Sequence, residues 1–261
     1  MRSLLLAALA LATPAAAQSL QRDTTREPVR TRVYVGPQIM PRTPGASEVR
    51  FGPFLDISRA RGDEVFEFEA PDESFAIPLT RIGGVELGPS LGFRNRRRAS
   101  DIDVPLHGVG FSFEVGGFAQ AYLTDRFRVR AEARKAVTGH KGWVGEVSAD
   151  YILRDGDDWL LSIGPRVTLT DARYQRAWYG ITPRDSAATG LAAYRPGGGL
   201  DSVGATIGYL RQLDRRWGIA AYARYDRLVG DPGDSPYVRT AGSRGQPSLG
   251  VALSYTFGTV G

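Results

Sequence analysis

The chain has 261 residues, of which 42% are hydrophobic and 23% charged, with 32 glycines, 16 prolines and no cysteine. This composition excludes a wholly disordered chain, and without cysteine we expect neither disulfide bonds nor a lipid-modified cysteine. The net charge of +5 is mild and evenly spread, which argues against nucleic acid as a partner. The many glycines and short apolar alternations favour an all-β protein.

An apolar leader opens the sequence. Residues 1–17 start with a basic residue, Arg2, and continue through leucines and alanines. This pattern predicts a secretory signal peptide cleaved between Ala17 and Gln18, with an apolar part too short to span a bilayer. We expect residues 18–30 to form a periplasmic arm and residues 31–261 to form the folded domain.

Charged and apolar residues alternate in the segment 125–136. Arginine or glutamate stands at every second position from 126 to 134, with Phe127, Val129, Ala131 and Ala133 between them. A period of two places the two sets on opposite faces of a strand, whereas a helix would mix charge into every face. The segment is therefore predicted to be a strand with one charged and one apolar face.

The same alternation recurs in seven segments between residue 109 and residue 257. The segments are about 10 to 15 residues long, enough for a tilted bilayer crossing, and longer than the strands of a soluble β-sandwich. Aromatic residues gather near their ends, and short connections alternate with long ones such as 171–197, as in outer-membrane barrels. The prediction is a transmembrane, antiparallel up-and-down β-barrel in the cell outer membrane.

The number of strands is less clear in the N-terminal third. Five stretches there have strand character, namely 32–39, 47–58, 63–70, 74–80 and 83–93. With the seven clear segments they give twelve strands, an even number that places both termini on the periplasmic side. Ten strands would require the loss of 32–39 and the fusion of two others, so we prefer twelve.

A barrel of this kind turns its apolar faces to lipid and its charged faces inward. An arginine facing lipid at mid-bilayer costs about 2–4 kcal/mol, so the register is fixed. Charges inside need partners of opposite sign. We expect a lumen network formed by Glu114, Arg128, Arg130, Glu132, Arg134, Glu146, Asp150, Arg166, Arg224 and Asp226.

Candidate catalytic residues are few. His107 and His140 are the two histidines, and both fall in predicted outer loops. A hydrolase that uses Ser100 or Ser186 is conceivable, but the G-x-S-x-G turn is missing. We therefore expect no enzyme.

The sequence has few groupings that could hold a metal, a cofactor or a lipid. Without cysteine, paired histidines or EF-hand spacing we expect no metal or other cofactor. The acidic run 63–73 favours a charged strand face and turn over a weak calcium site. For the basic run Arg94–Arg98, contact with lipopolysaccharide phosphates and a solvated rim stay equally open.

The long loop 171–197 carries a family signature. Its matching residues are Tyr179, Gly180, Thr182, Pro183, Ser186, Gly190 and Tyr194. With "GHKG" at 139–142, "GSRGQ" at 242–246 and the closing "SYTF", the sequence resembles the MipA/OmpV family of outer-membrane proteins over about 47–257. It departs from the family pattern at Pro232 and Gly233, and in the residues that follow Phe257.

The resemblance implies an outer-membrane barrel concerned with envelope maintenance. One member is described as a scaffold between a murein hydrolase and a murein synthase, and others are linked to adhesion, stress response or antibiotic susceptibility. The expected partners are outer-membrane lipid, lipopolysaccharide and these murein enzymes. The preferred function is a structural scaffold for peptidoglycan machinery, and the alternatives are a narrow channel for small solutes and an adhesion or stress-response surface protein.

Overall fold

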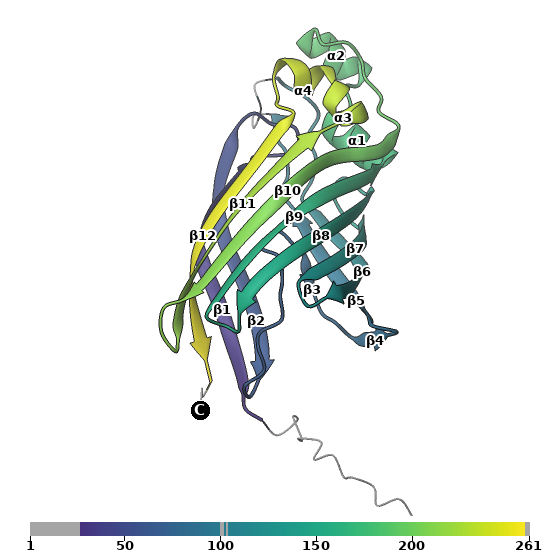
Figure 1. Cartoon of the computed structure of the whole chain (residues 1–261). Helices are drawn as coiled ribbons and strands as arrows, with labels where there is room; N and C mark the ends of the chain where they lie inside the picture. The colour runs from purple at the N-terminus through teal and green to yellow at the C-terminus, as the bar shows by residue number, and fades with distance from the viewer. Residues whose placement is uncertain (1–26, 100–101, 103, 259–261) are drawn as a thin grey trace, which may run out of the picture.

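The computed structural model describes residues 27–99, 102 and 104–258, and a large antiparallel sheet dominates this part of the chain (Figure 1). The long strands are β1 (Val29–Pro41), β2 (Val49–Arg61), β5 (Val85–Arg94), β6 (Ser112–Thr124), β7 (Phe127–Ala136), β8 (Trp143–Asp155), β9 (Trp159–Asp171), β10 (Gly198–Gln212), β11 (Trp217–Leu228) and β12 (Gly245–Phe257). Two short strands are β3 (Phe75–Ala76) and β4 (Thr80–Ile82). Four short helices are α1 (Ala172–Tyr179), α2 (Pro183–Thr189), α3 (Gly230–Asp234) and α4 (Pro236–Thr240).

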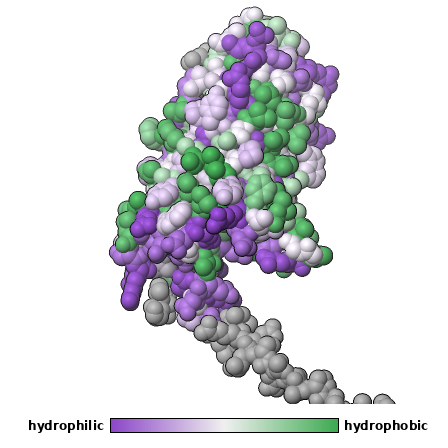
Figure 2. Space-filling model, viewed as in Figure 1, coloured by the Kyte–Doolittle hydropathy of each residue, from purple (hydrophilic) through white to green (hydrophobic). Residues whose placement is uncertain are grey.

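The strands form for the reason the sequence suggests. Along β7, Arg128, Arg130, Glu132 and Arg134 are buried, while the residues between them face outward. Outward apolar side chains on other strands, such as Val147, are about half exposed to the surroundings. Figure 2 shows hydrophobic residues gathered over the middle of one face, with hydrophilic residues at its two ends. The sheet thus has an apolar outside and a charged inside.

The sheet curls into a barrel in which the strands from β5 to β12 each pair with their neighbours in sequence, and β1 pairs with β2. The order is β2-β1-β12-β11-β10-β9-β8-β7-β6-β5-β3, with β4 on β5, and all pairings are antiparallel. The pairing of β1 with β12 joins the first and last strands. The helices and long loops gather at one end, and the tight turns and the last strand's end lie at the other (Figure 1). Among the described helices, none has the length and hydropathy needed to cross a bilayer.

Strand pairing does not close the barrel. β2 and β3 end the sheet, and within the described residues they share no register. The wall is therefore open between these two strands. We call the junction between β2 on one side and β3, β4 and β5 on the other the seam.

The twelve strands are not the twelve that were expected. The stretch 32–39 lies within β1, and 74–80 yields β3 and the first residue of β4. The stretch 63–70, expected as a strand, is not one. Residues 62–74 leave the wall after β2 and enter the barrel, where Phe66 and Phe68 are buried. We call residues 62–74 the lumen segment.

The expected leader cannot be compared with the structure in full. Residues 1–17, the cleavage position Ala17–Gln18 and the first part of the expected arm lie outside the described residues. The first strand begins at Val29, two residues before the expected start of the barrel.

The orientation of the wall can be tested at Val147 of β8, which lies opposite Ala131 and Val167 and is 47% exposed. We expect Val147→Arg to destabilise the inserted barrel by about 2–4 kcal/mol, since the guanidinium would face lipid. Heat-modified mobility on gels after refolding into vesicles measures this. Val147→Leu is the control, and equal folding of both variants would contradict the outward facing.

Candidate functional site

The charged interior of the barrel is the candidate site, and Arg128 of β7 lies near its centre. Its side chain is fully buried. One guanidinium nitrogen lies 2.8 Å from an Asp150 carboxylate oxygen, and the group also pairs with Glu73 of the lumen segment. The guanidinium stacks over the Phe68 ring at 4.4 Å and donates to the Phe68 carbonyl oxygen. Arg128 therefore connects two strands of the wall, β7 and β8, to the lumen segment.

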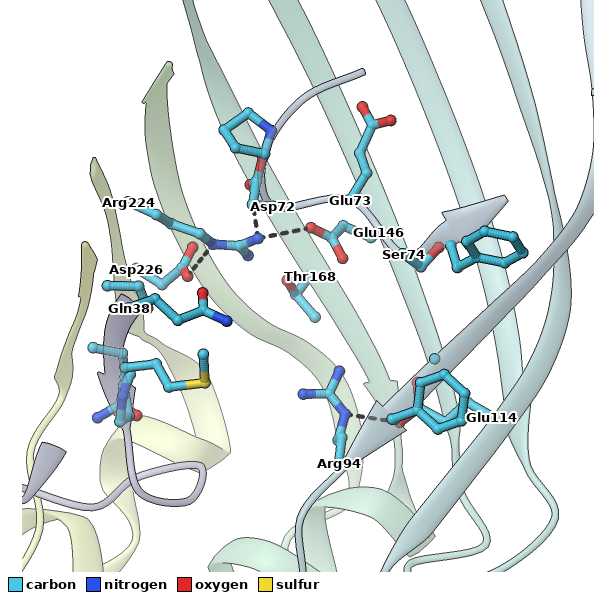
Figure 3. A pocket seen from close by; sticks show the side chains of 18 of the residues that line it. Gln38, Asp72, Glu73, Ser74, Arg94, Glu114, Glu146, Thr168, Arg224 and Asp226 are labelled. Atoms are coloured by element: carbon cyan, nitrogen blue, oxygen red, sulfur yellow. Dashed lines mark hydrogen bonds and ion pairs between the residues drawn. The ribbon is translucent and has the colours of Figure 1, made fainter. Parts of the chain in front are cut away.

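Asp72 of the lumen segment is bound by three strands. Its carboxylate accepts from the Arg166 guanidinium of β9 at 2.8 and 3.0 Å, and from Arg224 of β11 at 2.8 Å. The Thr206 hydroxyl of β10 donates to it at 2.7 Å. Arg224 also pairs with Glu146, and Figure 3 shows Asp72 and Glu146 converging on this guanidinium. Charge-assisted bonds of this kind are about twice as strong as neutral ones.

A second cluster surrounds Glu114 of β6. It accepts from Arg94 at 2.7 Å, from Arg134 at 3.0 Å and from the His140 ring Nε2 at 3.0 Å. The buried His140 also accepts at Nδ1 from the backbone N–H of Gly142. His140 lies in the outer loop between β7 and β8, as the sequence predicts, and its side chain belongs to the lumen network.

The lumen segment reaches a third cluster on β7. Glu132 pairs with Arg130 at 3.0 Å and with Arg134, and accepts a hydrogen bond from the Ser74 hydroxyl. The register sets Glu132 directly opposite Glu146. Two like charges in this position repel each other, and the neighbouring arginines offset that repulsion.

All ten side chains expected in the network face the lumen, and each one pairs with an opposite charge there. The sequence reasoning missed Asp72, Glu73 and Arg94. The pattern of the run 63–73 favours a charged strand face and turn, which the structure does not have over residues 63–70. The sequence does contain one indication of the true position of this run. It has six acidic residues and no basic one, so its charge is complementary to that of an arginine-rich lumen. No cluster suited to a metal ion occurs among the residues described.

The outer end of the barrel is covered by a cap, which we define as residues 95–99, 102, 104–111, 172–197 and 229–244. Its core contains Trp178, Tyr179, Leu106 and Tyr237, each at most 1% exposed. Arg97 enters this core and donates to the carbonyl oxygens of Trp178, Ala177 and His107. Arg97 therefore has an internal structural role within the basic run.

The family-signature residues build this cap. Thr182 begins α2 in a capping box with Asp185, Pro183 occupies the first turn, and Gly190 ends the helix at a φ of 75°. The backbone of Ile181 pairs with that of Tyr194, whose hydroxyl donates to the Asp231 carbonyl oxygen at 2.9 Å. The remaining signature residues are Tyr179, whose carbonyl oxygen accepts from Ser235, Gly180 at the end of α1, and Ser186 within α2.

The geometry around His107 does not form a serine hydrolase site within the described residues. Its ring nitrogens lie 2.8 Å from an Asp185 carboxylate oxygen and 3.1 Å from the Ala177 carbonyl oxygen. No hydrogen bond joins the Ser186 hydroxyl to a histidine in the described part of the chain. The other candidate, Ser100, lies outside the described residues.

A cavity of about 850 Å³ lies between the lumen segment and the cap. Asp72, Glu73 and Ser74 line it on one side, and Tyr174 and Tyr179 line it on the other. Arg94 and Glu114 lie at one wall and the Arg224 cluster at another (Figure 3). The cavity is polar and large enough to hold water or a small solute.

Comparison with known proteins decides the family. The family model described as "MltA-interacting protein MipA" matches residues 33–257, which is most of the chain. The chain belongs to the MipA family. This membership and the fold place the protein in the outer membrane, as the sequence predicted. No match was found among curated proteins.

Several solved structures are similar to the chain at low identity. One is titled "KdgM porin" (11% identity, TM-score 0.38, 88% of this chain and 99% of that chain covered). Another is the COG4313 outer membrane channel from Pseudomonas putida F1 (11%, TM-score 0.42, 89% and 95%). A third is OmpT, an outer membrane protein of Vibrio cholerae (9%, TM-score 0.37, 92% and 100%).

The variant Asp72→Ala measures how much the ion pairs of the lumen segment contribute to the stability of the barrel. The change leaves Arg166 and Arg224 without the carboxylate they share, and breaking a buried pair costs about 3–5 kcal/mol. We expect the free energy of unfolding in urea, measured for the protein folded in vesicles, to fall by about that amount and the urea midpoint to fall with it. Asp63→Ala, an exposed aspartate in the same segment, is the control. Equal midpoints for the two variants would show that the ion pairs do not hold the segment.

The cap offers a test by pH. Burial raises the pKa of Asp185, but hydrogen bonds from His107 and Thr182 outweigh it, so the pKa lies below its usual value. A lowered pKa contributes stability that is present above the unfolded value and is lost as pH falls through the folded value. We expect the protection of the α2 amides against hydrogen exchange, relative to an unfolded chain at the same pH, to fall below about pH 4. Asp185→Asn should exchange fast at neutral pH as well, and an unchanged profile in that variant would contradict this.

Proposed function

We propose that the protein is a closed, non-enzymatic scaffold of the outer membrane that holds peptidoglycan (murein) enzymes near the wall. The observation that carries the proposal is the lumen segment, which crosses the interior and is held there by buried ion pairs. A barrel whose lumen is filled in this way is suited to a structural role.

The periplasmic half of the lumen is filled by this segment. The guanidinium of Arg32 lies over the Phe66 ring at 4.1 Å and that of Arg30 at 4.8 Å. Arg154 donates to the Phe66 carbonyl oxygen at 3.0 Å. The space left beside Phe66 and Phe68 is a cavity of only about 70 Å³, room for few water molecules.

Withdrawal of the segment would be costly. Arg128 and Arg166 are both buried, at 0% and 2% exposure, and of their carboxylate partners each would keep Asp150 and lose the one on the lumen segment. Leaving one buried charge without its partner costs about 3–5 kcal/mol, and a shift from 1:99 to 99:1 in a population takes about 5.5 kcal/mol. These magnitudes support a lumen that rests closed.

The partner is proposed from the family description, which names an interaction with MltA. A murein hydrolase in the periplasm would meet the end of the barrel that carries the tight turns. The turns at 125–126, 156–158 and 213–216 present charged side chains there. Such a surface can bind a partner through complementary charges, with little need for a deep pocket.

Capture of periplasmic partners tests the scaffold. We expect the immobilised full-length protein to enrich a murein hydrolase from periplasmic extract. Combined Asp125→Ser, Arg126→Gln and Arg215→Gln changes in the turns should lower the yield about tenfold or more, the loss expected from removing one to two contacts of charged groups. Asp234→Ser with Arg184→Gln and Arg195→Gln in the outer loops is the matched control. An equal loss in both, or no enrichment by the unchanged protein, would overturn the proposal.

A narrow channel is the second candidate, because the cavity of about 850 Å³ is lined by charged groups of both signs. Conductance in planar bilayers separates the two functions. We expect the unchanged protein to be silent and Asp72→Ala to give brief openings, since the segment is then less firmly held. Steady conductance by the unchanged protein would contradict a closed barrel and support the channel.

A further inference from the structure

At the outer end of the seam lies a cluster of arginines that the lumen network does not use. A cavity of about 410 Å³ is lined there by Arg42, Val49, Arg50, Phe51, Asn95, Arg96 and Arg98. Four guanidinium groups thus line one cavity, and the described residues of its lining include no acidic side chain. Arg42 and Arg50 differ in this from the arginines of the lumen network, each of which faces a carboxylate.

The cluster brings together two loops from opposite sides of the seam. Arg42 and Arg50 belong to the connection between β1 and β2, and Asn95, Arg96 and Arg98 follow β5. Neither Arg42 nor Arg50 forms an ion pair with an acidic residue in the described part of the chain. Arg50 instead approaches the Met40 sulfur, and the Asn95 oxygen accepts from it in the amide orientation that satisfies both groups.

An apolar strip continues from this cluster along the seam. Phe51 and Leu55 of β2 are 81% and 65% exposed, and on the other side Phe75 and Phe93 are 54% and 62% exposed. Leu55, Phe75 and Phe93 line the main cavity, as do Arg42, Arg50 and Asn95 of the cluster. The site therefore has a cationic end at the outer surface and an apolar side toward the membrane.

Unpaired strand edges are not tolerated against hydrocarbon, because backbone N–H and C=O groups need partners. The edge of β2 is acceptable here because its residues Phe54 to Ile57 line the polar cavity, where water can reach them. The apolar side chains at the rim still face outward. An amphipathic molecule matches both features, and a soluble anion matches only the cationic end.

We propose that the seam binds an acylated lipid of the outer leaflet whose headgroup carries phosphate. Its phosphate groups lie among Arg42, Arg50, Arg96 and Arg98, and its acyl chains lie along Phe51, Leu55 and Phe93. Guanidinium groups form bidentate bonds to phosphate, and the barrel places them at the level of the outer headgroups. Bound in this way, the lipid bridges the two loops and ties the seam. The site is independent of the proposed scaffold role.

The test uses full-length protein in detergent micelles and three probes, namely a bis-phosphorylated hexa-acyl lipid A, its dephosphorylated form, and inorganic phosphate. A ligand that binds only the folded state raises its stability. We expect the phosphorylated lipid alone to raise the melting temperature and to remain bound in native mass spectrometry. If lipid A and its dephosphorylated form raise the melting temperature equally, the arginines do not recognise phosphate and the proposal is wrong. If inorganic phosphate raises the melting temperature as much as lipid A does, the acyl chains do not contribute and the ligand is not a lipid.

Variants locate the site. Arg42→Gln with Arg50→Gln should weaken lipid binding at least about tenfold, since each bond to a charged group contributes on the order of 1.5–3 kcal/mol. Arg59→Gln with Arg215→Gln makes the same change in charge at the other end of the barrel and should leave binding unchanged. Phe51→Ser should weaken binding of the lipid and leave any phosphate binding as it was. Equal affinity of the unchanged protein and the first variant would overturn the proposal.

A second copy of the chain is the competing occupant of the seam. Because the chain has no native cysteine, Phe51→Cys supplies a single thiol at the rim. We expect it to remain a monomer under oxidation in lipid. Efficient disulfide-linked dimers, together with no effect of the phosphorylated lipid on melting, would assign the seam to protein association and overturn the proposal.

Discussion

The pairing of buried arginines with carboxylates inside the barrel is the interaction on which the rest of the structure depends. Because lipid excludes charge, alternation along the strands sends every second side chain of β7 inward. Inside, an arginine is stable only with a partner. Asp150 supplies one for Arg128 and Arg166, and the lumen segment supplies the others through Asp72 and Glu73. The wall and its filling therefore stabilise each other.

The same constraint explains why the two ends of the barrel are built differently. At the outer end, loops long enough to form short helices bury an aromatic core around Trp178 and Tyr237. At the periplasmic end, the turns are too short to cover anything, so the lumen segment with Phe66 and Phe68 fills the interior. Between the two closures lies the polar cavity, and Arg94, which pairs with Glu114 and lies 5.3 Å from the Tyr174 ring, connects the wall to the cap.

Much of this could be predicted from sequence because the period-two pattern carries the information. The facing of Arg128 to Arg134 follows from alternation alone. The same rule failed at 63–70, since Phe66, Glu67, Phe68 and Glu69 alternate as a strand does. A segment inside a barrel also buries its phenylalanines and presents its carboxylates to arginines, so local pattern cannot separate the two. The seam escaped prediction for another reason, because pairing between distant edges depends on the curvature of the whole sheet.

The position of the lumen segment in the chain has a consequence for the wall. The segment joins β2 to β3, so both of its ends are attached to the strands that flank the seam. Because no ladder of backbone hydrogen bonds joins these two strands, the spacing between them depends on the thirteen residues inside the barrel and on the arginines that bind them. The filling of this barrel thus also sets the width of its wall.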